Sequence, residues 1–133
     1  MIGLDTNVLV RYIVQDSPAE SKAASRLIEG RCSAESPGFI GTLVLAEMVW
    51  VLRRAYSYDK GVVAGVLRQL LQTAELAVEN RAMAWAALRE FQQGTADFAD
   101  YLIGHTNHAH GCSATYTFNR RAAAGRYFEI LSK

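Results

Sequence analysis

Short apolar runs alternate with longer helical segments along the whole chain, and this alternation constrains the fold more than any other feature. It is typical of a parallel sheet with helices packed on both faces and right-handed crossovers between its strands. We therefore predict a three-layer α/β/α domain with a four- or five-stranded parallel sheet. The expected strands are the residues up to Leu4, then 37–40, 76–78, 113–118 and 127–131; the expected helices cover 8–14, 18–29, 43–52, a segment capped by Asp59, 81–92 and 97–109.

The length and composition of the chain fit one compact domain. It has 133 residues, of which half are hydrophobic and a fifth are charged, and a domain of this size buries roughly two-thirds of its unfolded surface. We therefore predict a single domain over residues 1–133. Cys32 and Cys112 are too few for a disulfide framework, and neither a signal peptide nor an apolar run of about 18 residues occurs. We expect a cytoplasmic protein with reduced thiols.

Arginine supplies most of the positive charge, because 11 of the 14 basic residues are arginines. Two adjacent pairs occur, Arg53-Arg54 and Arg120-Arg121. A guanidinium group donates two hydrogen bonds to a phosphate at once, which makes these pairs candidate contacts for nucleic acid. Arginine pairs are also common on ordinary solvated surfaces, so the pattern leaves both interpretations open.

Carboxylates occur at three places where apolar neighbours leave them little access to water. Asp5 follows the first strand, Glu47 is the only polar residue from Leu43 to Leu52, and Asp97 and Asp100 lie one turn apart at the start of a helix. Asp5 and Asp97 could each simply cap the helix that follows. Glu47 is harder to explain in this way, since a lone buried carboxylate costs several kcal/mol unless it is paired or bound to a cation.

If these acids converge, a divalent cation would neutralise them. A cluster of oxygen ligands without thiolate or imidazole suits Mg²⁺ or Mn²⁺ better than Zn²⁺. Such a metal can hold a phosphate oxygen and activate a water molecule, and two metals can clamp both sides of an in-line phosphodiester displacement. The acids therefore indicate a nuclease that needs no nucleophilic side chain.

Four ordered motifs resemble those of PIN-domain ribonucleases, and most closely the small VapC-type toxins of bacterial toxin–antitoxin pairs. The resemblance spans almost the whole chain. The motifs are Leu4-Asp5-Thr6-Asn7, Leu45-Ala46-Glu47, Ala96-Asp97-Phe98-Ala99-Asp100-Tyr101-Leu102-Ile103 and Thr117-Phe118-Asn119-Arg120-Arg121.

The resemblance implies a five-stranded parallel sheet and an endoribonuclease that depends on Mg²⁺ or Mn²⁺. It also implies a homodimer and a cognate antitoxin that masks the acidic pocket. By position, Asp5, Glu47 and Asp100 match the core acids that bind metal and catalyse, and Asp97 matches a further acid of the same kind. The residues at positions that support this pocket in the family are Thr6, Asn7 and Thr117. The arginines expected to approach the RNA backbone are Arg11, Arg120 and Arg121.

Asn119 departs from the family pattern, because an aspartate usually follows the Thr-Phe pair at this position. An amide offers a carbonyl oxygen or orients a water, but it brings no negative charge. This substitution motivates a second hypothesis, a catalytically impaired PIN domain that binds antitoxin or RNA without turnover.

Two further alternatives come from other protein classes. A phosphoacceptor receiver domain shares the length and the α/β pattern, but it needs adjacent acids after the first strand and a late lysine. This chain has only Asp5 at that strand, and its lysines are Lys22, Lys60 and Lys133. A zinc site is the other alternative, although its ligands lack finger-like spacing. The candidate zinc ligands are His105, His108, His110 and Cys112.

Overall fold

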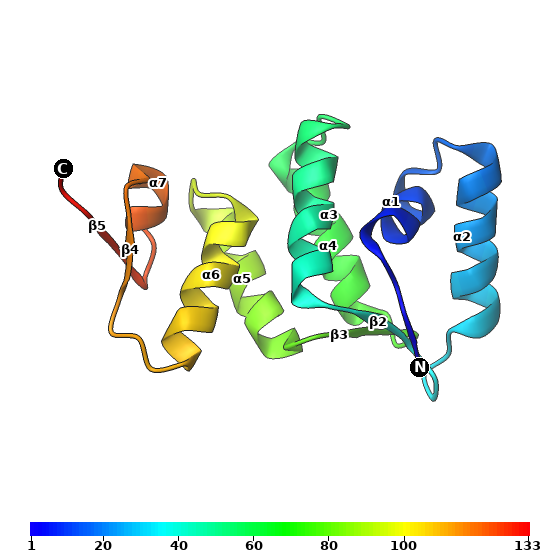
Figure 1. Cartoon of the computed structure of the whole chain (residues 1–133). Helices are drawn as coiled ribbons and strands as arrows, with labels where there is room; N and C mark the ends of the chain where they lie inside the picture. Colours follow the sequence, from blue (N-terminus) through cyan, green and yellow to red (C-terminus); the bar gives the residue numbers. More distant parts are fainter. The chain divides into compact units, whose positions relative to one another are not determined.

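The computed structural model describes all residues from 1 to 133 and divides the chain into two compact units (Figure 1). Unit 1 comprises Met1–Arg81, and unit 2 comprises Ala82–Lys133. The single domain over residues 1–133 stays a prediction. None of the helices combines the length and the apolar composition that spanning a membrane requires.

Unit 1 contains a parallel sheet and four helices. The sheet has the strand order β1-β2-β3, and its register pairs Gly3 with Phe39 and Ile40 with Val78. Because the strands are parallel, the residues that follow them lie at one edge of the sheet. The elements in chain order are β1 (Ile2–Gly3), α1 (Thr6–Val14), α2 (Pro18–Arg31), β2 (Gly38–Ile40), α3 (Thr42–Arg54), α4 (Lys60–Gln72) and β3 (Leu76–Val78).

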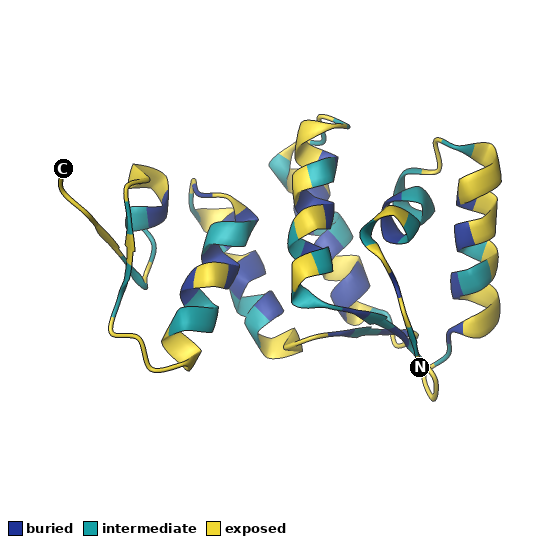
Figure 2. Ribbon diagram, viewed as in Figure 1, coloured by how far each residue is buried: buried dark blue, intermediate teal, exposed yellow.

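Helix α3 buries one face and exposes the other. Its buried residues are Leu45, Met48, Val49 and Leu52, which belong to the core of unit 1. The opposite face carries exposed residues along the helix, which Figure 2 colours yellow. These exposed residues are Leu43, Glu47, Trp50 and Arg54, at the spacing i, i+4, i+7 and i+11 of a single helix face.

Helix α4 confirms the predicted cap and buries most of an apolar face. The side chain of Asp59 accepts a hydrogen bond of 2.9 Å from the backbone N–H of Val62, as an N-cap residue does. Of the valine and leucine residues on its apolar face, four are buried, whereas Val66 is half-buried and Val62 is exposed. The four buried ones are Val63, Leu67, Leu70 and Leu71.

Unit 2 packs its helices around an aromatic core. The rings of Phe91 and Phe98 meet edge to face with their centroids 5.8 Å apart. Tyr101 lies so close to Gly94 that a Cβ atom there would overlap the tyrosine hydroxyl, which explains the glycine. Its elements are α5 (Arg81–Gln93), α6 (Phe98–Ala109), β4 (Thr115–Thr117), α7 (Arg120–Ala123) and β5 (Phe128–Ile130), and β4 pairs parallel with β5.

The predicted α/β class is confirmed, since five short strands alternate with seven helices and every strand pairing is parallel. The predicted single sheet of four or five strands is not what the structure shows, because the strands form a three-stranded and a two-stranded sheet. Apolar patterning indicates which residues are extended, but it does not determine which strand edges pair.

Candidate active site

A chain of contacts joins the first two predicted acids in unit 1. Asp5 directly precedes α1 as its N-cap residue, and its Oδ1 accepts a hydrogen bond of 2.7 Å from the backbone N–H of Thr6. The Thr6 hydroxyl donates a 2.6 Å hydrogen bond to Oε1 of Glu47 on α3. One threonine thus connects the edge that carries Asp5 with the helix that carries Glu47. Asn7 follows on α1 and lines a small cavity of about 260 Å³ beside Arg11.

The expectation that these carboxylates have little access to water is wrong for Asp5, Glu47 and Asp97, which are all exposed. For Glu47 the reason lies in α3, where apolar residues occur on both faces of the helix. Only the face with Met48 and Leu52 enters the core, and Glu47 lies on the other. Burial therefore gives no argument for a cation at Glu47, whereas its contact with Thr6 does place it near Asp5.

Glu79 is a residue of this edge that the sequence interpretation missed. It follows β3, and its Oε1 accepts a hydrogen bond of 2.8 Å from the backbone N–H of Thr42. Gly41, the N-cap residue of α3, has no side chain that could make this bond. Glu79 therefore caps the helix that carries Glu47, although it lies 37 residues after Thr42 in the chain. The signal available in the sequence was an acid directly after a predicted strand.

In unit 2, Asp97 and Asp100 shape the start of α6. Asp97 is the N-cap residue, and Oδ2 of Asp100 accepts a 3.1 Å hydrogen bond from the Asp97 backbone N–H. Burial raises the pKa of Asp100 above its usual value; the hydrogen bond from Asp97 N–H opposes this rise and the Asp97 charge adds to it. The capping explanation considered for Asp97 is thus compatible with the structure.

Thr117 and Asn119 form a local turn between β4 and α7. The Thr117 hydroxyl accepts a hydrogen bond of 3.0 Å from the Asn119 backbone N–H. Oδ1 of Asn119 in turn accepts hydrogen bonds from the backbone N–H groups of Arg121, at 2.9 Å, and Ala122, at 3.4 Å. Asn119 is therefore the N-cap of α7, and an aspartate could make the same contacts through a carboxylate oxygen.

The predicted RNA-binding arginines have different surroundings. The guanidinium group of Arg11 donates to Asp16 and Glu20, each at 3.0 Å, and to the Tyr56 hydroxyl at 2.9 Å. The hydrogen bond to Asp16 is the main reason why the pKa of Arg11 rises. Arg120 and Arg121 are exposed on α7, and Arg120 lines a cavity of about 710 Å³ in unit 2 together with Phe118 and Lys133.

The donors around Asp5 fit a magnesium or manganese ion by chemical type, since carboxylate and hydroxyl oxygens are what these ions prefer. Asp5 and Glu47 are brought together through Thr6, and Asp97 and Asp100 are neighbours on α6. Within each unit, no three His, Cys, Asp or Glu side chains form a group that could hold a metal by themselves.

The three histidines among the candidate zinc ligands are engaged in other contacts, whereas Cys112 is free and exposed. His105 bonds to Glu90, the ring of His108 stacks on Tyr127 with centroids 4.1 Å apart, and Nδ1 of His110 contacts the backbone oxygen of Thr106. These contacts hold α5, α6 and the segment before β5 of unit 2 together. Histidines in such roles stabilise the fold without any metal.

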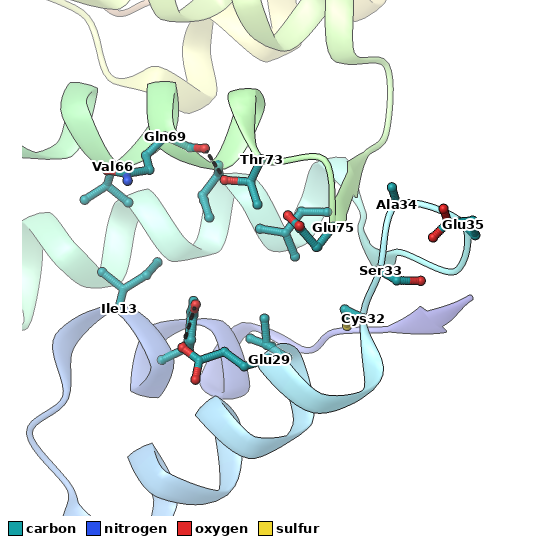
Figure 3. A pocket seen from close by; sticks show the side chains of 14 residues that line it. Ile13, Glu29, Cys32, Ser33, Ala34, Glu35, Val66, Gln69, Thr73 and Glu75 are labelled. Atoms are coloured by element: carbon teal, nitrogen blue, oxygen red, sulfur yellow. Dashed lines mark hydrogen bonds between the residues drawn. The ribbon is translucent and has the colours of Figure 1, made fainter.

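A further cavity lies within unit 1 (Figure 3). It has a volume of about 810 Å³, and carboxylates of Glu29, Glu35 and Glu75 line it together with apolar side chains such as Ile13 and Val66. Burial, with a smaller effect of Glu29, raises the pKa of Tyr12 in this cavity. None of the predicted site residues lines it, so it is not the acidic site inferred from the motifs.

The PIN-domain family model matches residues 2–126, and the chain therefore belongs to the PIN-domain family. PIN domains are generally nucleases that use divalent metal ions, which agrees with the oxygen donors at Asp5 and Glu47. The receiver-domain alternative is wrong, because the PIN-domain match covers nearly the whole chain. Comparison with curated proteins finds no significant match.

Proposed function

We propose that the protein is a VapC-type toxin, an endoribonuclease that hydrolyses RNA phosphodiester bonds with Mg²⁺ or Mn²⁺ and is inhibited by a cognate antitoxin. The observation that carries the proposal is the contact series from Asp5 through Thr6 to Glu47, which sets two carboxylates beside the carboxyl edge of a parallel sheet. The PIN-domain match over nearly the whole chain supports the same reaction. We also propose that the protein acts as a homodimer in the cytoplasm, where its two free cysteines stay reduced.

Each acid has a role in this proposal. Asp5 and Glu47 supply oxygen ligands, and Thr6 keeps the Glu47 carboxylate turned toward the start of α1. Asp97 and Asp100 supply the further ligands that the family motif assigns to them, while Asn7, Thr117 and Asn119 support the site through polar side chains. A bound divalent metal supplies charge neutralisation at the phosphate and a more acidic water.

The arginines are proposed to contact the RNA backbone. Arg120 and Arg121 are exposed and lack an acidic partner among the observed ion pairs, so their guanidinium groups can donate to phosphate. Arg11 contributes less directly, because its Nε and Nη1 atoms already bind Glu20, Asp16 and Tyr56.

Asn119 supports a second candidate function, a PIN domain that binds antitoxin or RNA without turnover. Its amide oxygen caps α7, so the residue has a structural use that needs no negative charge. In this alternative metal binds weakly because Asn119 brings no negative charge, and the RNA is bound without being cleaved.

The test incubates the pure protein with a pool of cellular RNAs, with Mn²⁺ and with EDTA, and maps the new RNA ends. Asp5→Asn and Glu47→Gln are the informative variants, because each amide can keep the hydrogen bond with Thr6 while the negative charge is lost. Both should abolish Mn²⁺-dependent cleavage, and expression of the native protein, but not of these variants, should arrest growth.

Cleavage that persists in EDTA or in both variants would reject the metal-dependent reaction. Absence of cleavage by the native protein, together with RNA or metal binding and with cleavage restored by Asn119→Asp, would favour the impaired binding module instead.

A further inference from the structure

Trp50 is an exposed aromatic side chain on the helix that carries Glu47. It has 61% of its surface exposed, whereas large aromatic residues are mostly buried in folded proteins. The other tryptophan of the chain, Trp85, is half-buried. Trp50 therefore contributes little to the core, and tryptophan in such a position is a residue type that is enriched at binding interfaces.

The neighbours of Trp50 on α3 suggest what it contacts. Glu47 precedes it by three residues and Arg54 follows it by four, so their side chains lie on the same helix face at separations of about 5–6 Å between Cβ atoms. Arg54 is exposed, as are Glu47 and Trp50. The face thus presents a carboxylate, an aromatic ring and a guanidinium group in consecutive turns.

This order of groups matches the parts of a nucleotide. An aromatic ring stacks on any base, and a guanidinium group donates to the phosphate that follows. Trp50 and Arg54 are four residues apart, so they are separated by about 6 Å, roughly one turn, along the helix axis. Stacking requires a base that is not already paired and stacked in a duplex.

We propose that Trp50 is the base-stacking residue for an unpaired nucleotide of the RNA substrate, with Arg54 holding an adjacent phosphate. The inference rests on the proposed nuclease function, which it deepens by assigning substrate binding to the exposed face of α3. Trp50 selects single-stranded over double-stranded RNA, because only an unpaired base can lie on its ring.

Intrinsic fluorescence provides a direct test. In a Trp85→Phe background Trp50 is the only tryptophan, and EDTA keeps the RNA intact during the titration. A single-stranded decanucleotide should quench the emission of Trp50, whereas a blunt duplex of the same length should not. Anisotropy of labelled RNA then gives the dissociation constant for each variant without any need for turnover.

Three variants separate stacking from simple apolar packing. Trp50→Leu keeps an apolar side chain without a ring and should weaken binding of the decanucleotide roughly tenfold or more. Trp50→Phe keeps a ring and should lose only about threefold. Leu43→Ala is the matched control, since it truncates the other exposed apolar residue of this face and should leave the dissociation constant unchanged.

Unchanged emission with RNA, or equal affinity of native and Trp50→Leu proteins, would overturn the inference. So would a loss of self-association in both Trp50→Leu and Leu43→Ala without a change in RNA affinity, which would identify the face as a protein interface. RNA binding that depends on Trp50 without Mn²⁺-dependent cleavage would instead reject the nuclease function alone. Cleavage that depends on Asp5 but not on Trp50 would reject the inference alone.

Discussion

The Thr6 hydroxyl donates a 2.6 Å hydrogen bond to the carboxylate of Glu47, although 41 residues separate them in the chain. The bond links the first residue of α1 to the second turn of α3. It also leaves the Asp5 carboxylate next to Glu47, since Asp5 binds the backbone N–H of the same threonine.

Replacing Thr6 by valine should therefore reduce catalysis more than stability. Valine keeps the shape but removes the hydroxyl, so Glu47 becomes free to turn away from Asp5. We expect a loss of about 1 kcal/mol in the free energy of unfolding, as for a typical hydrogen bond, and a fall in kcat of at least about tenfold. Urea unfolding and cleavage of a labelled RNA measure the two quantities. Thr6→Ser retains the hydroxyl and should restore most of kcat; equal kcat in all three proteins would contradict the role.

Asp100→Asn should stabilise the metal-free protein while removing activity. The pKa of Asp100 is raised mainly by burial, so the folded state disfavours its ionised form. A raised carboxyl pKa costs stability at every pH above the folded pKa, and the cost disappears below the unfolded value near 3.8. The amide can still accept the hydrogen bond from the Asp97 N–H.

Thermal unfolding in EDTA tests whether Asp100→Asn stabilises the metal-free protein. At pH 7 the melting temperature of Asp100→Asn should equal or exceed that of the native protein, and the difference should shrink toward pH 3. A variant that is less stable at pH 7 would show that the carboxylate contributes more to α6 than its burial costs.

Two variants of Asn119 separate its role as the N-cap of α7 from the effect of the missing negative charge. Asn119→Asp keeps an oxygen for the N–H groups of Arg121 and Ala122, so its stability should stay within about 0.5 kcal/mol, whereas Asn119→Ala should lose about 1 kcal/mol. If Asn119 faces the metal, the aspartate should bind Mn²⁺ roughly fivefold to tenfold more tightly, since one charge pair at about 4 Å contributes about 1 kcal/mol even in water. Calorimetric titration with Mn²⁺ measures this, and equal affinity would place the metal elsewhere.

Arg11→Ala should lower stability, whereas Arg120→Ala should lower only RNA affinity. Arg11 bonds to Asp16, Glu20 and Tyr56, which come from three different segments of unit 1. The pKa of Asp16 is lowered, first by the Tyr56 hydroxyl and then by Arg11. A lowered carboxyl pKa stabilises the fold above the unfolded value near 3.8 and ceases to do so as the pH falls through the folded pKa.

The Arg11→Ala defect should therefore appear as a melting temperature reduced by a few degrees at pH 7 and by less below pH 3. Filter binding at two salt concentrations measures the RNA affinity of both variants and its dependence on salt. A salt dependence that is reduced in Arg120→Ala and unchanged in Arg11→Ala would fit the assigned roles. The reverse result would assign the backbone contact to Arg11.

Local signals in the sequence predicted most secondary structure. Apolar patterning located β3 at Leu76–Val78, and capping residues located the starts of α4 at Asp59 and α6 at Asp97. Smaller errors occurred where local signals are weak: α2 continues through Gly30 to Arg31, and the four-residue helix α7 was not expected.

The features that escaped prediction depend on contacts between distant residues. Nothing in the run from Leu43 to Leu52 indicates which apolar face enters the core, so Glu47 was expected to be buried and is exposed. The bond of Glu79 to Thr42 and that of Thr6 to Glu47 need the strands and helices to be paired first. A family resemblance predicted the acids, but it did not supply these supporting contacts.

Glu79 caps α3, the helix that bears Glu47. The start of this helix therefore depends on a residue that the ribosome adds 37 positions after Thr42. Until β3 has paired with β2 in the correct register, the first turn of α3 lacks this partner and frays more readily. Nascent chains that end before β3 should therefore hold Glu47 on a loosely formed helix. The Glu47 carboxylate should therefore become ordered in the same folding step that completes the sheet of unit 1.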